Sequence, residues 1–249
     1  MPAASRHVER AIRAIATRSS GSAGSRALRL ALPLLALAAC STQVNGSGSY
    51  GQVRYDGLPA VHGVRLDGKI GQMEVRVGVA SAGSQSVVLS GDENIVHYYV
   101  KLAVTPDGIL LANLDGVDSV TPTMPLRIDA TVVAFDTVDV TANASVEVAG
   151  AAADTFHVAA DERSTVKLAG SGGNILDATL EDGSRLDARS YPATGVQLDV
   201  SASDAVVTLA TSVPVTGQAS GTSELQVFGS VTGCSAIALT PPATCLPAP

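Results

Sequence analysis

The fold is indicated by three stretches that recur at a constant spacing: Val146-Glu147-Val148, Val166-Lys167-Leu168 and Leu186-Asp187-Ala188. In each stretch two apolar residues flank a charged one, which is the alternation of a half-buried strand. Two further copies follow at Val206 and Leu225, and the last of these comes one position early. We therefore expect a short strand in each of five repeats.

A fixed period of about 20 residues predicts a β-solenoid, in which successive turns stack and share ladder hydrogen bonds. Ser164, Ser184 and Ser223 stand two positions before their strand members, and Asp204 takes that place in the fourth copy. Small polar or glycine-rich segments separate the strands at 169–173, 188–192 and 218–222. The alternative is a meander or sandwich with evenly spaced strands. The constant phase over five copies favours the solenoid.

The residues before the repeats also predict strands. Residues 73–79 alternate between apolar and polar side chains, and residues 87–89 form a short apolar run. Residues 95–104 form a long β-prone run that includes His97, and the turn residues 105–108 connect it to 109–111 as a hairpin. Turn chemistry is expected at Gly91-Asp92-Glu93-Asn94. The expected fold class is all-β, with parallel β-helix-like repeats preceded by additional strands and hairpins.

Residues 1–39 resemble a secretory signal peptide. A basic region contains six arginines: Arg6, Arg10, Arg13, Arg18, Arg26 and Arg29. The apolar stretch 30–39 follows, and it is too short to span a bilayer, which needs about 20 residues. We expect this segment to direct export and to be removed.

The apolar stretch ends in Leu37-Ala38-Ala39-Cys40, which resembles the lipobox of bacterial lipoproteins. The resemblance implies cleavage before Cys40, attachment of diacylglycerol to its sulfur, and a membrane partner held through acyl chains. Because Ser41 rather than Asp follows, lipoprotein sorting in Gram-negative bacteria implies the outer membrane. The alternative is ordinary cleavage after Ala36-Leu37-Ala38, which would leave Cys40 as a free thiol.

The charge of the exported part excludes some partners. Residues 1–39 hold six of the 16 Lys and Arg and one of the 23 Asp and Glu, so the remainder has 10 basic and 22 acidic residues and a formal net charge of −12. Nucleic-acid binding requires clustered basic residues, so we expect no nucleic-acid partner. Electrostatic attraction to anionic lipid is disfavoured for the same reason.

Two cysteines remain beside Cys40, namely Cys234 and Cys245. In an oxidising compartment an isolated pair is expected to form a disulfide. The alternative, a metal site, lacks nearby histidine, because the exported part has only His62, His97 and His157.

Nothing in the sequence predicts a catalytic triad. No Gly-x-Ser-x-Gly elbow is present, and His97 and His157 are expected to be outward-facing strand residues. Asp177, Asp187 and Asp199 would suit glycan cleavage if they shared one face. The chain has no Trp, three Phe and five Tyr, so it has few aromatic platforms for sugars. We expect no enzymatic activity.

The charges of successive repeats explain one of these acids structurally. Glu147, Lys167 and Asp187 occupy equivalent positions and alternate in sign, so stacked neighbours would attract one another on a solvated face.

Calcium is the remaining metal to consider. Gly170-Ser171-Gly172-Gly173-Asn174 is distantly similar to the glycine-rich calcium nonapeptide, but it occurs once where that motif acts in tandem. Asp115-Gly116-Val117-Asp118 lacks the spacing of an EF-hand. Both are expected to be turns, and neither a metal nor another cofactor is expected.

Several motifs follow the lipobox in a fixed order: Val64-Arg65-Leu66-Asp67-Gly68, Glu74-Val75-Arg76-Val77, Gly91-Asp92-Glu93-Asn94-Ile95-Val96 and Asp107-Gly108-Ile109-Leu110. This order resembles the "head GIN domain" family of candidate auto-transporter adhesins, over residues 60–232. The resemblance implies a parallel β-helix-like fold in the cell envelope. The later repeats depart from the family's usual Ser-Gly-Ser-Gly punctuation.

Five segments are expected: a lipoprotein signal peptide (1–39), a Gly/Ser-rich lipidated tether (40–58), an N-terminal β portion (59–125), solenoid repeats (126–232) and a Pro-rich cap (233–249). The expected function is non-enzymatic adhesion or contact with surface polysaccharide or protein. The alternatives are a structural or stress-related lipoprotein facing the periplasm and, more distantly, a glycan-active β-helix enzyme.

Overall fold

The computed structural model describes residues 42–66, 70, 72–80, 85–141, 143–211 and 214–248. Regular structure in these residues consists almost entirely of strands, so the expected all-β class is confirmed. Residues 40–249 form one compact unit. The signal peptide and Cys40 lie outside the described residues.

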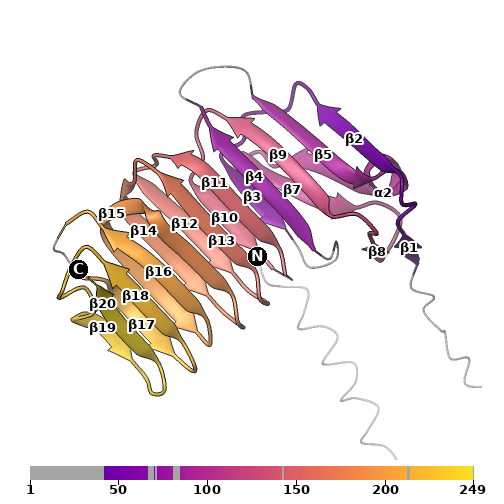
Figure 1. Cartoon of the computed structure of the whole chain (residues 1–249). Helices are drawn as coiled ribbons and strands as arrows, with labels where there is room; N and C mark the ends of the chain where they lie inside the picture. Colours follow the sequence, from indigo (N-terminus) through magenta and orange to yellow (C-terminus); the bar gives the residue numbers. More distant parts are fainter. Residues whose placement is uncertain are drawn as a thin grey trace, which may run out of the picture. The chain divides into compact units, whose positions relative to one another are not determined.

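Parallel strands make up two ladders (Figure 1). The first ladder contains, in spatial order, β7 (Ile109–Leu114), β3 (Gly63–Leu66), β10 (Thr137–Val140), β12 (Thr155–Ala160), β14 (Gly173–Leu180), the second half of β15 (Arg185–Ser201), β17 (Thr216–Ser220) and β19 (Ala236–Leu239). The second contains β9 (Leu126–Val132), β4 (Met73–Val79), β11 (Ser145–Ala151), β13 (Thr165–Gly170), the first half of β15, β16 (Asp204–Leu209), β18 (Glu224–Phe228) and β20 (Thr244–Ala248).

The register from β11 to β15 follows the predicted repeat. Val146 pairs with Val166, which pairs with Leu186. These residues are fully or almost fully buried, whereas Glu147 between the apolar positions is exposed. The period-two alternation therefore separates an apolar inner side from a polar outer side, as strand geometry requires.

The predicted register is wrong by one residue in the fourth copy. Ala205, not Val206, pairs with Leu186 and with Leu225. Leu180 pairs with Val200, so the five residues 181–185 before Leu186 correspond to only four residues, 201–204, before Ala205. Ser203, not Asp204, is consequently the equivalent of the buried serines in the other copies.

Those serines form a buried column at the corner that leads from the first ladder to the second. Its members are Ser164, Ser184, Ser203 and Ser223, each at most 2% exposed. The Ser184 hydroxyl donates to the Ala160 carbonyl at 2.9 Å, and the Ser203 amide donates to the Ser223 hydroxyl at 3.2 Å. The Ser164 hydroxyl has no hydrogen-bond partner among the described residues.

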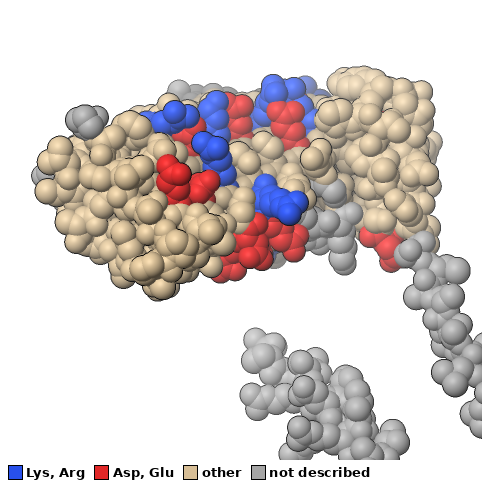
Figure 2. Space-filling view, turned by 60° about the horizontal axis from the view of Figure 1, so that its bottom comes forward, with Lys and Arg blue, Asp and Glu red and all other residues tan. Residues whose placement is uncertain are grey.

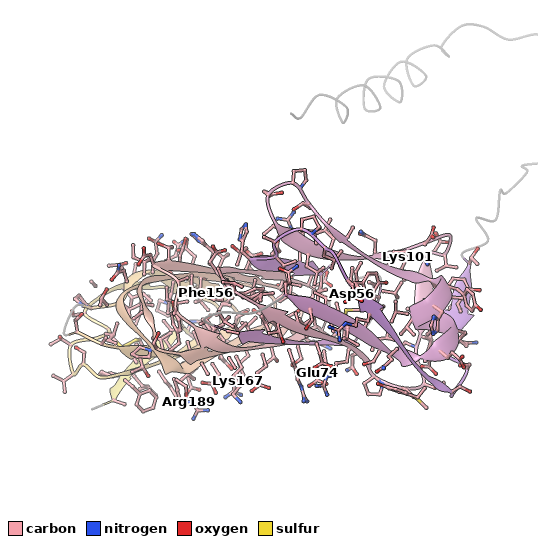
Figure 3. The ribbon with its side chains drawn as sticks, turned by 90° about the horizontal axis from the view of Figure 1, so that it is seen from above. Asp56, Glu74, Lys101, Phe156, Lys167 and Arg189 are labelled. Carbon is pink, nitrogen blue, oxygen red and sulfur yellow. A yellow bond between two sulfur atoms is a disulfide. The ribbon has the colours of Figure 1, made fainter. Side chains whose placement is uncertain are left out.

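Val, Leu and Ala side chains from both ladders fill the interior, together with a short aromatic stack. Ring centroids are 6.2 Å apart between Phe135 and Phe156 and 5.6 Å apart between Phe156 and Tyr191. Figure 3 shows Phe156 between the strands. The Tyr191 hydroxyl donates to the Ala153 carbonyl at 3.2 Å, so this buried phenol is satisfied. Three of the scarce aromatic residues, Phe135, Phe156 and Tyr191, are thus used in the core.

Antiparallel strands extend the ladders at the N-terminal side. β5 (Ser86–Asp92) pairs with β9, β2 (Tyr50–Tyr55) pairs with β5, and β6 (Val100–Val104) pairs with β7. The hairpin predicted around residues 105–108 is therefore confirmed.

The expected strand through residues 95–99 is wrong. These residues lie in and just after the helix α2 (Glu93–Tyr98), which buries Ile95 and Val96. His97 is exposed as expected, but on this helix. So short a segment cannot display helical periodicity, and its β-branched residues favoured a strand interpretation.

Three expected segment boundaries differ from the structure. Part of the expected tether forms β2 and β1 (Gln43–Asn45), the latter pairing in parallel with β8 (Ser119–Thr121). β3 and β4 pair with β10 and β11, so no structural boundary separates 59–125 from 126–232. Residues 236–248 continue both ladders as β19 and β20, so the expected cap is a further repeat. In each case backbone pairing extends beyond the apolar periodicity visible in the sequence.

Candidate functional site

A row of shallow hollows begins at the corner where the chain passes from the second ladder to the first and continues along the outer side of the first ladder. The largest has a volume of about 680 Å³ and is lined by His62, Asp136 and His157 among others. The next, of about 230 Å³, includes His157, Asp177 and Thr179, and a third, of about 150 Å³, includes Thr179, Asp199 and Gln218. We define the polar track by six of these residues: His62, Asp136, His157, Asp177, Thr179 and Asp199.

The strand register explains why the track is continuous. Residues 137, 157 and 177 stack on neighbouring parallel strands, as do residues 139, 159, 179 and 199. All of these point away from the apolar interior because they alternate with buried positions. Neighbouring strands lie about 4.8 Å apart, so the track offers regularly spaced polar groups across the ladder.

His62 occupies the first hollow. Its Nδ1 lies 2.9 Å from Asp136 Oδ1, and its Nε2 contacts the Asp107 carbonyl oxygen. The hydrogen bond with Asp136 raises the pKa of His62 above its ordinary value of 6.5, burial opposes this increase, and the Asp107 carbonyl adds to it. The Thr137 hydroxyl also donates to Asp136 Oδ1, at 2.7 Å. The imidazole is therefore held in one orientation.

Two further side chains near the track are paired with carboxylates across strands. Nδ1 of His157 on β12 lies 3.3 Å from Asp177 Oδ2 on β14, and Nε of Arg65 on β3 lies 2.5 Å from Asp139 Oδ2 on β10. His157 is outward-facing on a strand, as expected. The Arg65–Asp139 pair neutralises part of the local charge, and the surface offers both hydrogen-bond donors and acceptors.

The three acids considered for glycan cleavage do not come together. Asp177 and Asp199 lie on the polar track, on β14 and β15. Asp187 lies on the second ladder, where Arg189 binds it through Nε at 2.9 Å. That hydrogen bond lowers the pKa of Asp187 despite its partial burial. Asp187 and Asp199 are both on β15, and this strand passes from the second ladder to the first between them. The sequence could not reveal this separation.

Asp187 belongs to a column of alternating charge on the second ladder. The column contains Asp129, Arg76, Glu147, Lys167 and Asp187 on five adjacent parallel strands. Lys167 Nζ lies 2.9 Å from Glu147 Oε1, and this hydrogen bond together with the charge of Lys167 lowers the pKa of Glu147. Figure 2 shows blue and red side chains gathered over the middle of one face, and in Figure 3 Lys167 and Arg189 point outward on one side. The predicted alternation of Glu147, Lys167 and Asp187 is confirmed.

The glycine-rich segment that was considered for calcium binding instead allows neighbouring stretches of backbone to approach one another closely. Gly172 has φ +85°, and a Cβ there would collide with the Pro192 carbonyl oxygen. Gly173 approaches Ala153 and the Tyr191 hydroxyl in the same way. Among the described residues, no three His, Cys, Asp or Glu side chains converge as metal ligands would.

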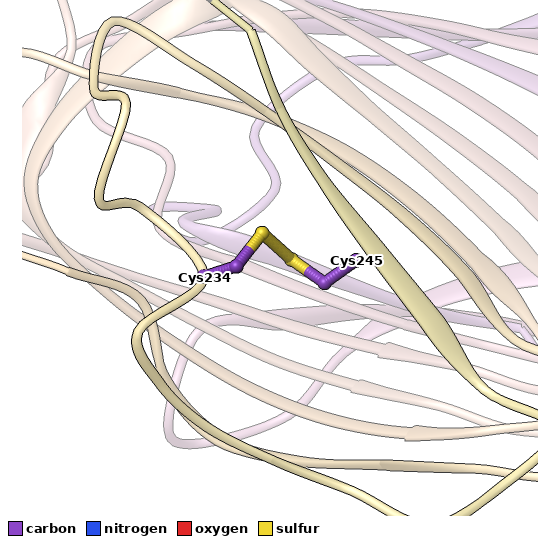
Figure 4. Close-up of a disulfide and its surroundings, with 2 residues drawn as sticks. All are labelled: Cys234 and Cys245. Carbon is purple, nitrogen blue, oxygen red and sulfur yellow. A yellow bond between two sulfur atoms is a disulfide. The ribbon is translucent and has the colours of Figure 1, made fainter.

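Cys234 and Cys245 form a disulfide, with an S–S distance of 2.02 Å (Figure 4). Cys245 lies on β20, in register with the buried Leu225, and Cys234 lies in the loop before β19. The bond therefore joins the last strand of the second ladder to the chain that enters the last strand of the first. The lipidation site expected at Cys40 lies outside the described part of the chain.

A network that the sequence did not predict fixes the N-terminal segment. Asp92 is fully buried and accepts hydrogen bonds from the amides of Gly48, Thr123 and Met124 at 2.7–2.9 Å and from the Thr123 hydroxyl at 2.6 Å. Asp92 is also the N-cap residue of α2, but its carboxylate makes no hydrogen bond within the helix. Burial raises the pKa of Asp92, but these hydrogen bonds outweigh burial and bring the pKa below its ordinary value of 3.8.

Asn94 and Asp118 complete this network. Asn94 accepts a hydrogen bond from the Ser47 amide at 2.8 Å and donates to the Asn45 carbonyl at 2.9 Å. Asp118 accepts one from the Thr42 amide at 2.8 Å. We call residues 42–48, together with Asp92, Asn94 and Asp118, the N-terminal latch. The only sequence signal was the Asp-Glu-Asn segment, which carried the family resemblance without indicating a role.

No known family's sequence profile and no curated protein matches the chain. Several solved structures align with most of the chain. A candidate adhesin from Bacteroides fragilis is 16% identical, with a TM-score of 0.57 over 82% of this chain and 97% of its own. A candidate lipid-binding protein from Parabacteroides distasonis (11%, TM-score 0.49) and a candidate adhesin from Parabacteroides merdae (12%, TM-score 0.45) each align with 83% of this chain and 97% of theirs. The likeness to the first is one of fold.

No helix in the described ranges is long and apolar enough to span a bilayer.

Proposed function

We propose that the protein is a non-enzymatic lipoprotein of the cell envelope, exported by residues 1–39 and anchored by lipid on Cys40. The parallel ladders, with their nearly constant period, support a β-solenoid architecture of the head GIN type. The lipobox resemblance and Ser41 support an anchor in the outer membrane. The disulfide between Cys234 and Cys245 fits an oxidising compartment.

The polar track carries the proposed role, which is adhesion to a surface polysaccharide. Its hollows are shallow and follow one another across parallel strands, which suits an extended polar chain. Hydroxyl, amide, imidazole and carboxylate groups supply hydrogen bonds for sugar hydroxyls. A protein partner is less well matched, because stable protein interfaces usually have an apolar centre.

The arrangement of acids favours binding over glycan cleavage. Glycoside hydrolysis requires two carboxyl groups that flank one bond in defined roles. Asp187 is on the other ladder, and the imidazole of His157 contacts Asp177. The strongest reason for an enzymatic interpretation, a shared face for all three aspartates, is therefore lost.

The location is tested by protease treatment of intact cells, with detection of the C-terminal segment and a Cys40→Ala control. We expect degradation of the wild-type protein while a periplasmic marker survives. Protection until the outer membrane is opened would contradict adhesion and favour the structural, periplasm-facing role.

The binding role is tested with purified protein and an array of bacterial and host polysaccharides. Thr179→Arg places a long side chain where the second and third hollows meet and is expected to abolish binding. Gln226→Arg, the matched control, makes the same kind of change on the second ladder and should leave binding intact. Equal binding by both variants would contradict the assignment of the track, and binding to proteins alone would exclude polysaccharide as the ligand.

A further inference from the structure

We propose that the end of the unit that carries the N-terminal latch lies directly against a lipid bilayer, with Tyr50 and Tyr98 at the level of the headgroups. This proposal rests on lipid attachment at Cys40 and adds an orientation to it. The predicted flexible tether would have allowed the strands to tumble freely above the membrane, whereas the latch removes that freedom.

The chain between the lipid and the fold is very short. Only Ser41 separates Cys40 from Thr42, whose amide already donates to Asp118. Two extended residues span at most about 7 Å. An acylated sulfur remains at the bilayer surface, so residue 42 and its partners must stay close to the headgroups.

The latch attaches the following residues firmly to the fold. β1 pairs with β8, and the Gln43 side chain donates to the Thr121 hydroxyl at 2.6 Å. Asp92 and Asn94 bind the chain again at residues 45–48, and the Glu93 amide donates to the Ser49 carbonyl at 2.7 Å. Fixed contacts thus extend from residue 42 into β2, without a flexible interval.

Two exposed tyrosines flank the latch. Tyr50 begins β2 directly after Ser49 and is 64% exposed, and Tyr98 ends α2 and is 68% exposed. A tyrosine combines an apolar ring with a polar hydroxyl, and such side chains are enriched at membrane–water interfaces. This chemistry suits headgroup contact better than it suits free solution.

The local charges favour a zwitterionic lipid surface. The side chain of Lys101 reaches back to the His97 carbonyl at 3.2 Å, while Glu93, Asp115 and Asp118 supply acidic groups around α2 and β8. Anionic lipid is therefore not attracted, and the acyl chains with the two tyrosines must supply the contact.

The absence of Trp from the chain provides a clean test. Tyr98→Trp introduces a single fluorescent reporter at the latch, and Leu246→Trp introduces one on β20, where Leu246 is 53% exposed. Residues 40–249, which form one compact unit, are coupled through Cys40, the one thiol outside the disulfide, to maleimide lipid in phosphatidylcholine vesicles. We expect attachment to the vesicles to shift the emission of the Tyr98→Trp protein to shorter wavelength and brominated acyl chains to reduce its intensity, with no change for Leu246→Trp.

Three results bear on the proposal separately. If brominated lipid leaves the emission of both reporters unchanged, the proposal is overturned. A flexible Gly/Ser insertion between Ser41 and Thr42 should abolish the quenching, and quenching that survives would contradict the role of the short connection. Because coupling places lipid on Cys40 chemically, lipidation in cells is decided independently, by the mass of the mature protein extracted from membranes.

Discussion

At the scale of single residues, Asp92 shows how a buried carboxylate is stabilised without a cation. Four hydrogen bonds from three residues satisfy its oxygens, and the donors come from chain segments far apart in sequence. Its removal would leave buried amides without an acceptor, which costs more than the loss of the bonds themselves. The same atoms position α2 and the N-terminal segment, so one side chain organises the whole latch.

We predict that Asp92→Ala lowers the free energy of unfolding by about 3 kcal/mol, because several charge-assisted hydrogen bonds are lost together. Glu93→Ala, at the neighbouring exposed position, should change it by less than about 0.5 kcal/mol. Chemical denaturation at neutral pH measures both values. Equal effects would contradict the role given to Asp92.

The contribution of Asp92 should also depend on pH. Its pKa is lower in the folded state than its ordinary value of 3.8, so the unfolded chain takes up a proton first as pH falls. The stabilisation is therefore fully present above that value and is lost as pH decreases through the folded pKa. The difference in the free energy of unfolding between wild type and Asp92→Ala should become smaller as the pH is lowered from 7 into this acidic range. A constant difference would contradict a contribution from the ionised Asp92 carboxylate.

The serine column offers a matched pair of substitutions. Ser184→Ala removes the hydrogen bond to the Ala160 carbonyl and should destabilise the protein by about 1 kcal/mol. Ser164→Ala removes a buried hydroxyl that has no partner in the described part of the chain, so it should be neutral or stabilising. Thermal denaturation of both variants decides whether the column acts through its hydrogen bonds or through packing alone.

At the scale of strands, the column of alternating charge stabilises the register of the second ladder. Each member faces an opposite charge on the adjacent strand, whereas a shift of one residue would place apolar side chains in solvent. Exposed ion pairs contribute little individually. Their main effect is to disfavour other pairings of very similar strands.

Lys167→Glu would place three carboxylates next to one another on β11, β13 and β15. We predict a loss of about 1 kcal/mol at low ionic strength, which added salt reduces by screening the repulsion. Lys101→Glu is the matched control, because Lys101 faces the uncharged Asn113 across β6 and β7. A salt-independent loss, or an equal loss in the control, would argue against the charge column.

Strands with clear alternation were predictable from the sequence, while short and irregular elements were not. Residues 73–79 form β4 with the predicted bounds, because every second side chain enters the core. The fourth repeat was misaligned because Ala205, Val206 and Val207 are all apolar, so hydrophobicity alone could not detect a corner shortened by one residue.

The candidate site was less predictable than the fold. The sequence correctly indicated the charge alternation through Lys167, which follows from the repeat spacing, and the disulfide, which follows from the presence of only two cysteines besides Cys40. It did not indicate the polar track, because His62 and Asp136 are far apart in the chain. The sequence did not indicate the latch for the same reason. A Gly/Ser-rich segment is expected to be flexible, and its buried acceptor, Asp92, is far away in the chain.

At the scale of the whole unit, each strand of a parallel ladder pairs only with its neighbouring strands. The stability of each end therefore depends on contacts made close to that end. The latch acts at the N-terminal side, and the disulfide acts at the strands β19 and β20. Short terminal strands and Pro247 in β20 limit pairing with other chains at the exposed edge.

Loss of the disulfide, by Cys234→Ser with Cys245→Ser, should destabilise this end by about 3 kcal/mol, as expected for a closed loop of this size. Because coupling between distant strands is weak in such ladders, amide hydrogen exchange should increase in β19 and β20 and remain slow in β4 and β11. A uniform increase along the chain would instead indicate that the unit unfolds as one cooperative whole.

If the protein is anchored by lipid and adheres to a distant surface, as proposed, it is under tension, and the latch determines where the load enters. Tension between the lipid and a ligand on the polar track would pass first through β1. The hydrogen bonds between β1 and β8, and then those of the Asp92 network, must break before β2 can separate from the unit. If they fail, residues 42–55 release roughly 45 Å of chain at about 3.3 Å per residue while the ladders stay intact. The same segment that is proposed to hold the unit close to the membrane at rest would then lengthen under force and limit the load on the ladders.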